Sequence, residues 1–278
     1  MPEFDTPEPI NVTLEFDIGT ARIIAGRRTT TVVEILPSDG ATELDVRAAQ
    51  LTHVVCTGDT LLVKGSKKRS LFGSSGSIDV IIELPAGSHL QGVAPMADFT
   101  CEGRIGNCRL KTSFGDIRID EAATANLRTG RGDIRLDRAT GDAEVVGAGR
   151  VDIGQVTGAV TVKNGNGETA VGDVTGHLRI NSSNGRITVD SAHASVDAKS
   201  ARGAIRIGEV TRGQVTLQAA AGDLEVGIRE ATAAWLDVNT RFGTVRNSLG
   251  PFDGPGDAGS TVEVRARTGV GDIVIRRS

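Results

Sequence analysis

A short pattern recurs nine times along this chain: a glycine followed by alternating polar and apolar positions, Gly-x-apolar-x-apolar. Its clearest copies begin at Gly115, Gly132, Gly149, Gly185, Gly203 and Gly271, and weaker ones begin at Gly167, Gly222 and Gly243. From the first copy onward, the intervals between these glycines are 17, 17, 18, 18, 18, 19, 21 and 28 residues. A unit this short cannot bury its own apolar face, so the pattern predicts stacked repeats that share one interior.

Each unit also contains a second alternating segment about nine residues after the first, such as the one with Leu178 and Ile180. A small apolar residue, such as Val156, lies between the two segments. Alternation with period two is typical of strands that bury one face, and parallel stacking about 4.8 Å apart would join equivalent positions into columns. The chain is therefore predicted to be all-β, folded as a single-stranded parallel β-solenoid, or β-helix, with about 18 residues per turn.

Helices and a β-sandwich fit the pattern less well. A helical period of 3.6 residues would scatter the apolar columns, and a glycine in each unit would cost about 1 kcal/mol. A sandwich also has turn signals every 8–12 residues. It gives no reason, however, for a small residue to recur at one phase of successive units.

The first part of the chain lacks the period. Strands are expected there at residues 10–18, 31–36, 51–56, 60–63 and 78–84, the third and fourth forming a hairpin about Gly58-Asp59. A bare solenoid end is an exposed strand edge that invites aggregation. Residues 1–90 are therefore predicted to form a mostly antiparallel β capping subdomain, and residues 91–278 the solenoid. The irregular last turns, ending at Arg276-Arg277-Ser278, are interpreted as a second cap.

The composition is that of a globular protein, with 38% hydrophobic and 24% charged residues in a chain of 278 and a net charge of −4. No apolar run approaches the roughly 20 residues of a transmembrane helix, and the acidic N-terminus does not resemble a signal peptide. We expect a cytoplasmic protein without a transmembrane segment, with association at the cell surface as an unsupported alternative. The net negative charge predicts no binding of nucleic acid.

Cysteine and histidine are used sparingly. Cys56, Cys101 and Cys108 are too few for a disulfide scaffold, which favours a reducing compartment. The repeat register places Cys101 and Cys108 in the core. The four histidines lack the spacing of a zinc site, so no metal, cofactor or catalytic residue is predicted.

The Gly-Asp steps of the repeat resemble two binding motifs. Arg131-Gly132-Asp133 spells a cell-adhesion tripeptide, yet it is the repeat's own Gly-Asp step with an ordinary arginine before it. Calcium-binding rolls need a G-G-x-G-x-D run every nine residues, and this chain has none. A structural role for the Gly-Asp steps is therefore the favoured interpretation.

Two groups of charged residues were considered as sites. The outward positions of the repeat carry the carboxylates Asp116, Asp133, Glu168, Asp223 and Asp272, interspersed with arginines. Enzymes that cleave acidic sugars use such groups, but no catalytic motif accompanies them here. The densest positive charge is Lys64, Lys67, Lys68 and Arg69, which indicates either a contact with an anion or a partner, or a solvated hairpin loop.

Several segments together resemble a known bacterial family. They are Ile81-Ile82-Glu83-Leu84-Pro85-Ala86-Gly87-Ser88, Glu102-Gly103-Arg104-Ile105-Gly106, the Gly-Asp-Ile steps, and the stretch from Val264 to Ile273. The chain is similar over residues 10–277 to the β-strand-repeat "putative adhesin" family, a domain family of unknown function common in high-GC Gram-positive bacteria. The resemblance implies a β-solenoid and transfers no catalytic residue.

These observations favour a non-enzymatic β-solenoid that serves as a scaffold or binding protein. Its expected partner is an unidentified protein or a second copy of the chain, since stacked strands present rigid, regular ladders of side chains. Two alternatives stay open: an adhesin or envelope-associated binding protein, and a carbohydrate-active β-helix enzyme. The second would require close carboxylates in a cleft.

Overall fold

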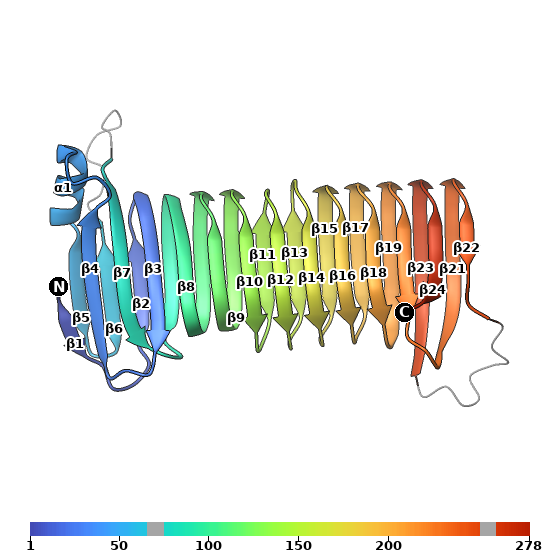
Figure 1. Cartoon of the computed structure of the whole chain (residues 1–278), viewed down its shortest axis with the longest axis horizontal. Coiled ribbons are helices and arrows are strands. Elements are labelled where there is room, and N and C mark those ends of the chain that lie inside the picture. The colour runs from blue at the N-terminus through green and yellow to red at the C-terminus, as the bar shows by residue number, and fades with distance from the viewer. Residues whose placement is uncertain (66–74, 251–259) are drawn as a thin grey trace. The chain divides into compact units, whose positions relative to one another are not determined.

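The computed structural model describes residues 1–65, 75–250 and 260–278, and divides into two compact units, Met1–Thr140 and Gly141–Ser278. Within the described ranges there is one helix, α1 (Glu43–Gln50), and all other regular elements are strands. Both units are built mainly from strands stacked in parallel, which confirms the predicted all-β solenoid (Figure 1).

Unit 1 combines parallel and antiparallel pairing. Its strands are β1 (Glu3–Asp5), β2 (Asn11–Glu15), β3 (Ile18–Gly26), β4 (Thr30–Pro37), β5 (His53–Thr57), β6 (Thr60–Lys64), β7 (Ser77–Pro85), β8 (His89–Phe114), β9 (Ile117–Arg131) and β10 (Ile134–Ala139). In parallel, β2 joins β6 and β8, β3 joins β7 and β8, and β9 joins β8 and β10. The antiparallel pairs are β1–β4, β4–β7 and β5–β6.

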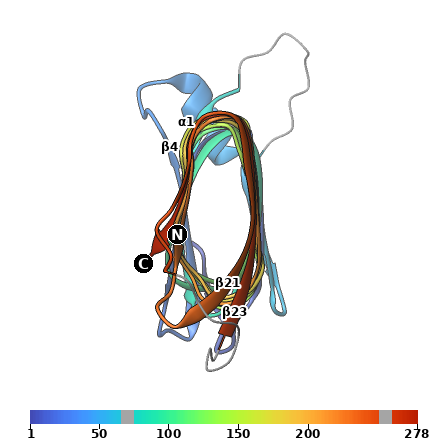
Figure 2. The ribbon, with the colours of Figure 1, turned by 90° about the vertical axis from the view of Figure 1, so that its right-hand side faces the viewer.

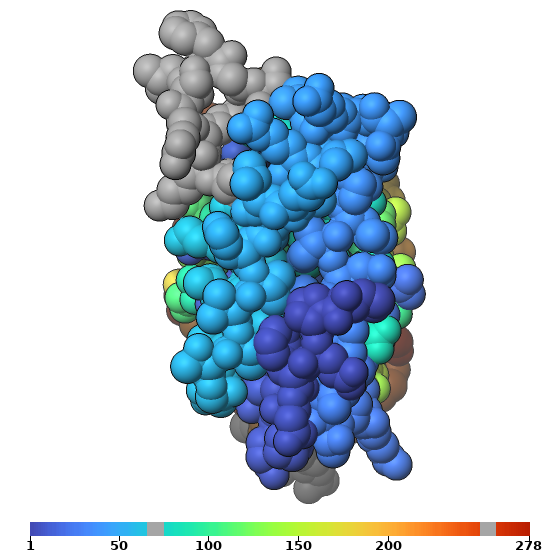
Figure 3. Space-filling model, turned by 90° about the vertical axis from the view of Figure 1, so that its left-hand side faces the viewer, coloured from blue at the N-terminus to red at the C-terminus, as the bar shows by residue number. Residues whose placement is uncertain are grey.

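The antiparallel strands all precede residue 90, while β8 runs through that position as one strand. The earliest residues, drawn in blue, cover the face of unit 1 seen in Figure 3. The division into a cap of residues 1–90 and a solenoid of residues 91–278 stays a prediction.

Two local features of unit 1 differ from the sequence expectations. The strand expected at residues 10–18 is divided into β2 and β3, because the chain turns a corner at Phe16, whose buried ring lies 6.1 Å from that of Phe99. Helix α1 was not expected. Its first turn carries Glu43 and Asp45, which suit the positive end of the helix dipole. One oxygen of Asp45 also accepts the backbone N–H of Ser77 at 2.8 Å.

Unit 2 consists of two parallel stacks, and each turn contributes one strand to each stack. In the view along the stacking direction, successive turns superimpose (Figure 2). The first stack, in spatial order, is β11 (Ala143–Gly147), β13 (Val160–Asn164), β15 (Leu178–Asn184), β17 (Val196–Arg202), β19 (Gly213–Ala221), β23 (Ser260–Val270) and β21 (Thr232–Phe242). The second is β12 (Val151–Val156), β14 (Thr169–Val174), β16 (Ile187–Ala192), β18 (Ile205–Val210), β20 (Leu224–Ile228), β24 (Ile273–Arg277) and β22 (Val245–Asn247).

The register of unit 2 follows the repeat. Ile187 pairs with Ile205, 18 residues later, and Ile205 pairs with Leu224. All three side chains are 0% exposed, so the alternating positions form a continuous buried column as predicted. Each turn contributes a few small apolar side chains, and the column grows by one member per turn.

The repeated glycine has a steric reason. Gly185 has a φ of +110°, and a Cβ at this position would lie 2.0 Å from the carbonyl oxygen of Gly167 in the preceding turn. A side chain would therefore meet both an unfavourable backbone conformation and a direct clash. The stacking of turns at this corner requires glycine in successive units.

The last two turns are exchanged relative to the order expected from the sequence. Strands β23 and β24 lie between β19–β20 and β21–β22, because β23 pairs with both β19 and β21, and β24 with both β20 and β22. The turn made of β21 and β22, residues 232–247, is here called the terminal turn. The last strand, β24, is therefore not the outermost strand of its stack, and the interpretation of the irregular last turns as a second cap stays a prediction.

Candidate functional site

In unit 1 the aspartates of the Gly-Asp steps bind the backbone of the neighbouring turn. Oδ1 of Asp98 accepts the N–H of Asp116 at 2.8 Å, and Oδ1 of Asp116 accepts the N–H of Asp133 at 2.9 Å. Gly132 adopts a φ of +138° beside this step. The adhesion-like tripeptide that contains Gly132 and Asp133 therefore belongs to the hydrogen-bonded ladder between turns.

Unit 2 repeats this arrangement. Oδ1 of Asp223 accepts the N–H of Asp272, and Oδ1 of Asp272 accepts the N–H of Thr244, both at 2.8 Å. Three of the five carboxylates considered for sugar cleavage, Asp116, Asp223 and Asp272, are thus bound to the main chain. Hydrogen bonds of this kind align successive turns and oppose slippage of the register.

The other reactive residue types serve the core or pair locally. Cys101 and Cys108 are buried and free, which confirms that they are core thiols. The hydrogen bond with Cys108 and burial raise the pKa of the Cys101 thiol well above its ordinary value, so this thiol does not ionise readily. In the described part of the chain, no three His, Cys, Asp or Glu residues gather as metal ligands. None of the described helices is long and apolar enough to span a membrane.

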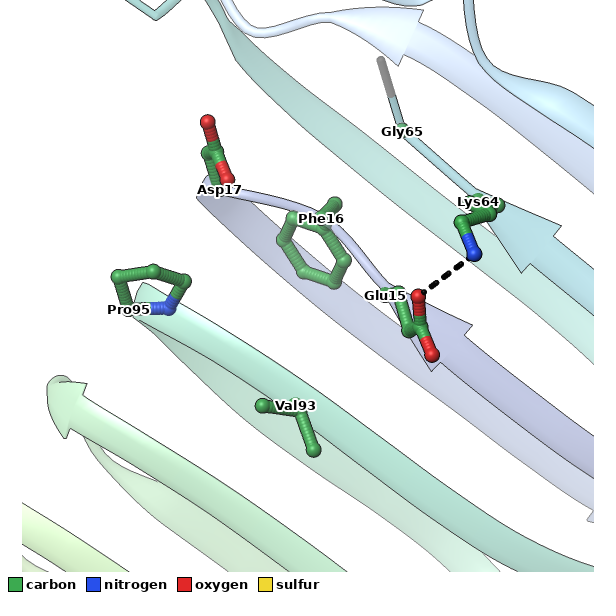
Figure 4. Close-up of a pocket in the computed structure, with 7 residues that line it drawn as sticks. All are labelled: Glu15, Phe16, Asp17, Lys64, Gly65, Val93 and Pro95. Atoms are coloured by element: carbon green, nitrogen blue, oxygen red, sulfur yellow. Dashed lines mark ion pairs between the residues drawn. The ribbon is translucent and has the colours of Figure 1, made fainter. Parts of the chain in front are cut away.

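A shallow pocket of about 290 Å³ lies at a corner of unit 1 (Figure 4). It is lined by Glu15, Phe16, Asp17, Lys64, Gly65, Val93 and Pro95. The Nζ of Lys64 lies 3.1 Å from Oε2 of Glu15, and Oδ2 of Asp17 accepts a hydrogen bond from Ser75 at 2.8 Å. The pocket therefore combines an apolar wall with a cation that a carboxylate already neutralises.

Of the predicted basic segment, the structure places only Lys64. Lys67, Lys68 and Arg69 lie outside the described residues. The proposed contact of these four cations with an anion or a partner stays a prediction. The pairing of Lys64 with Glu15 joins β6 to β2 and could not be read from the sequence, since 49 residues separate the two side chains.

A column of polar side chains on the outer face of unit 2 was not predicted from the sequence. Its members occupy equivalent positions of the first stack and are all exposed: Lys163, Asn181, Lys199, Gln218, Arg267 and Asn239. We call this set the basic column. It contains three cations and no carboxylate. The signal was available in the sequence, because each residue directly follows the second apolar residue of its alternating pair, as Lys199 follows Ala198.

The neighbouring column modifies this charge. Arg267 donates to Asp237 at 3.2 Å, and the Nζ of Lys199 lies 3.6 Å from Asp197. These ion pairs are exposed, so each stabilises the fold by at most about 1 kcal/mol. Lys163, at one end of the column, has no carboxylate partner among the described residues, and the polar amides between the cations carry no charge.

Stacked parallel turns, a glycine at the same corner of successive units and aspartates that bind the next turn define the chain as a β-solenoid repeat protein. The model of the Toastrack DUF4097 family matches residues 22–278, and the chain belongs to this family. The match confirms the resemblance to a bacterial β-repeat family whose function is unknown.

Solved structures of low sequence identity align with the whole chain. One is described as a "putative cell adhesion protein" from Clostridium sporogenes, with 9% identity, a TM-score of 0.28, and coverage of 100% of this chain and 98% of that one. A "putative adhesin" from Bacteroides fragilis has 11% identity and a TM-score of 0.36, with coverage of 99% and 95%. No curated protein matches the chain in sequence.

Proposed function

We propose that this protein is a non-enzymatic binding scaffold whose basic column contacts an acidic surface of a partner protein. The observation that carries this proposal is the alignment of Lys163, Lys199 and Arg267 in one exposed column of a regular stack. Neighbouring strands are about 4.8 Å apart, so cations on alternate strands repeat about every 9.6 Å.

The scaffold role follows from how the cations are held. They project from the middle of strands whose register is set by buried columns and by the Asp ladder. This name denotes the hydrogen bonds from backbone N–H groups to the aspartates of the neighbouring turn, such as Asp116 and Asp223. Little conformational freedom of the main chain is therefore lost when a partner binds, which favours affinity. The chain as a whole is acidic, with a net charge of −4. Selectivity for an acidic partner thus depends on this local column and weakens as salt screens it.

The carboxylates offer support for a role without catalysis. A general acid or nucleophile must reach the substrate with a carboxyl oxygen. Oδ1 of Asp116 and Oδ1 of Asp223 instead accept main-chain N–H groups of the next turn. We therefore assign these side chains to the assembly of the stack. The scaffold also takes a second copy of the chain as a partner, through the terminal turn.

The proposal can be tested with two variants of equal charge change. Lys163→Gln/Lys199→Gln removes two of the three positive charges of the basic column, while Arg186→Gln/Arg206→Gln removes two positive charges associated with the other stack. A partner captured from the source cells is purified, and its Kd is measured by calorimetry. We expect the first variant to bind at least tenfold more weakly and the control to bind within about twofold of wild type.

Three results would contradict this function. Equal affinity of both variants for the captured partner would show that the basic column is not the contact. Release of reducing sugars from an acidic polysaccharide, abolished by Asp116→Ala in a folded protein, would show an enzyme instead. The wild-type protein could instead bind nucleic acid preferentially and lose this binding only in Lys163→Gln/Lys199→Gln. That result would show that the ligand of the basic column is a nucleic acid and not a protein.

A further inference from the structure

The terminal turn exposes positions that every preceding turn buries. Val245 pairs with Ile273 and occupies the same inward column, yet Val245 is 40% exposed and Ile273 is 0% exposed. In the other stack, Leu236 is half-buried, whereas Val264 beside it is 0% exposed. The interior of unit 2 thus opens at the terminal turn.

The edge of β21 is also unpaired on one side within the described part of the chain. β21 is 11 residues long and pairs with β23 alone. It contains neither proline nor lysine, the residues that commonly block such edges. Two of its own side chains, Trp235 and Phe242, are exposed by 57% and 66%. A long edge strand with exposed aromatic side chains is a site for pairing with another strand.

The charges of β21 indicate which strand it pairs with. Asp237 and Arg241 lie symmetrically about Asn239, two residues to either side. If two copies of β21 pair antiparallel about a two-fold axis through Asn239, Asp237 of each copy lies opposite Arg241 of the other. Opposite charges in directly facing positions stabilise a strand pair, and like charges destabilise it.

The same axis keeps the two faces of the sheet consistent. Antiparallel pairing about Asn239 places Val238 of each copy opposite Thr240 of the other, and both are half-buried positions of the inward face. The half-buried Leu236 lies opposite Phe242, which is exposed at the end of the strand. The exposed ring of Phe242 in one copy then covers Leu236 of the other. Asp237 already accepts a hydrogen bond from Arg267, and a carboxylate can accept further bonds.

We infer that the terminal turn is the interface of a two-fold dimer, in which β21 pairs antiparallel with β21 of a second copy of this chain. The interface is isologous, because each copy offers the same strand to the other. It closes the interiors of both copies and leaves no unpaired β21 edge. The inference rests on the proposed scaffold function, since it names one partner of that scaffold.

Charge exchange at the axis tests the geometry. In a dimer of Arg241→Asp, the new carboxylate of each copy faces Asp237 of the other. In a dimer of Asp237→Arg, the new cation of each copy faces Arg241 of the other. Like charges therefore face each other in both homodimers and oppose association. We expect each to raise the dimer Kd at least tenfold in sedimentation equilibrium. An equimolar mixture of the two restores association, because the opposite charges then face each other again. Trp235, the only tryptophan in the chain, reports dissociation by its fluorescence on dilution.

Crosslinking locates the axis independently. Asn239→Cys, made in a Cys56→Ser background, places the thiols of the two copies next to each other on the two-fold axis. We expect this variant to form a disulfide-linked dimer under mild oxidation. Asn181→Cys is the matched control, because it lies in the same exposed column within the stack and should stay monomeric under denaturing conditions.

Several outcomes would overturn the inference. One is that the wild-type protein stays monomeric over a hundredfold range of concentration. Another is that the dimer Kd is unchanged both in Arg241→Asp and in the mixture of Arg241→Asp with Asp237→Arg. Loss of the dimer in Val55→Lys, on the edge strand β5 of unit 1, would assign the interface to that strand. Lys163 and Lys199 lie on β13 and β17, away from the axis residues of β21. Calorimetry of Lys163→Gln/Lys199→Gln with the acidic partner therefore distinguishes failure of the scaffold function from failure of the dimer.

Discussion

The internal turns of unit 2 and its terminal turn are built to the same pattern but differ in burial. Ile187, Leu224 and Ile273 in one column are fully buried, while Val245 at the end of that column is 40% exposed. Residue type alone does not explain this, since all four side chains are apolar. In a stacked fold, the contribution of a side chain to the free energy of unfolding depends on whether other turns cover it on both sides or on one side only.

The first strands of unit 1 show another solution for an edge. Leu61 and Val63 of β6 are 0% exposed, and β6 pairs with β2 on one side and with the antiparallel strand β5 on the other. There the edge strand is short and ends in a hairpin, which limits pairing with other chains. The edge of the terminal turn in unit 2 is longer and lacks such a hairpin.

The largest expected effect is a charge placed in the internal column. Ile187→Asp leaves an unpaired carboxylate among buried apolar groups and should destabilise the fold by about 4 kcal/mol or more, or abolish soluble expression. Val245→Asp, in the same column at the terminal turn, should cost less than about 1 kcal/mol. Arg186→Ala, exposed beside Ile187, should leave the melting temperature nearly unchanged. Equal melting of the first variant and wild type would mean that the inward column is misassigned.

Glycine substitutions extend the comparison to unit 1. Gly185→Ala combines a φ of +110° with a Cβ 2.0 Å from a carbonyl oxygen, and should cost about 3 kcal/mol. Gly58→Ala, in the hairpin between β5 and β6, has a φ of +59° but no atom within 4 Å, and should cost about 1 kcal/mol. Chemical denaturation measures both values. Equal costs would show that the stack relaxes around the added methyl group.

The Asp ladder predicts a smaller effect that again depends on position. Asp223→Ala removes the acceptor for the N–H of Asp272 inside the stack and should cost about 1–2 kcal/mol in global stability. Asp272→Ala removes the acceptor for Thr244 in the terminal turn, so we expect faster hydrogen exchange of residues 244–247 and little global change. The prediction fails if both variants lower global stability equally.

The smallest effect concerns the turn before α1. The N–H of Ala41 and the hydroxyl of Thr42 donate to the carboxylate of Asp39, at 2.9 and 3.0 Å, and lower its pKa from the ordinary value of an aspartate. A folded-state pKa below the unfolded one stabilises the turn above the unfolded pKa, and this contribution is lost as the pH falls through the folded pKa. Carboxyl NMR should therefore show Asp39 titrating at a lower pH in the folded protein than in the unfolded chain. Titration at the same or a higher pH would contradict the assigned hydrogen bonds.

The sequence was sufficient to predict what repeats. Strands, buried columns and the core position of Cys101 follow from alternation at a constant interval, which stacking converts directly into contacts. Helix α1 was missed because eight residues with little apolar periodicity give a weak signal against tertiary packing. The exchange of the last two turns was missed because each carries the same inward pattern and fits on β19 and β20 equally well by that criterion.

The candidate sites were predictable to a lesser extent. The basic column is implied by the repeat register, once residues such as Lys163 and Lys199 are aligned two units apart. The ion pair of Lys64 with Glu15 depends instead on a contact between β6 and β2 in the non-periodic part of the chain. No local sequence pattern indicates this contact.

The exchanged turns also set a problem of timing during synthesis. The ribosome completes residues 232–247 before residues 260–277, although the later segment occupies the inner place on β19 and β20. The ends of the two segments, residues 247 and 277, are about 30 residues apart. At about 5–20 residues per second, the synthesis of this stretch takes roughly 2–6 seconds. During that interval the earlier segment either stays unpaired or stacks on β19 and is later displaced. Growth of this solenoid is therefore not a simple addition of turns in the order of translation.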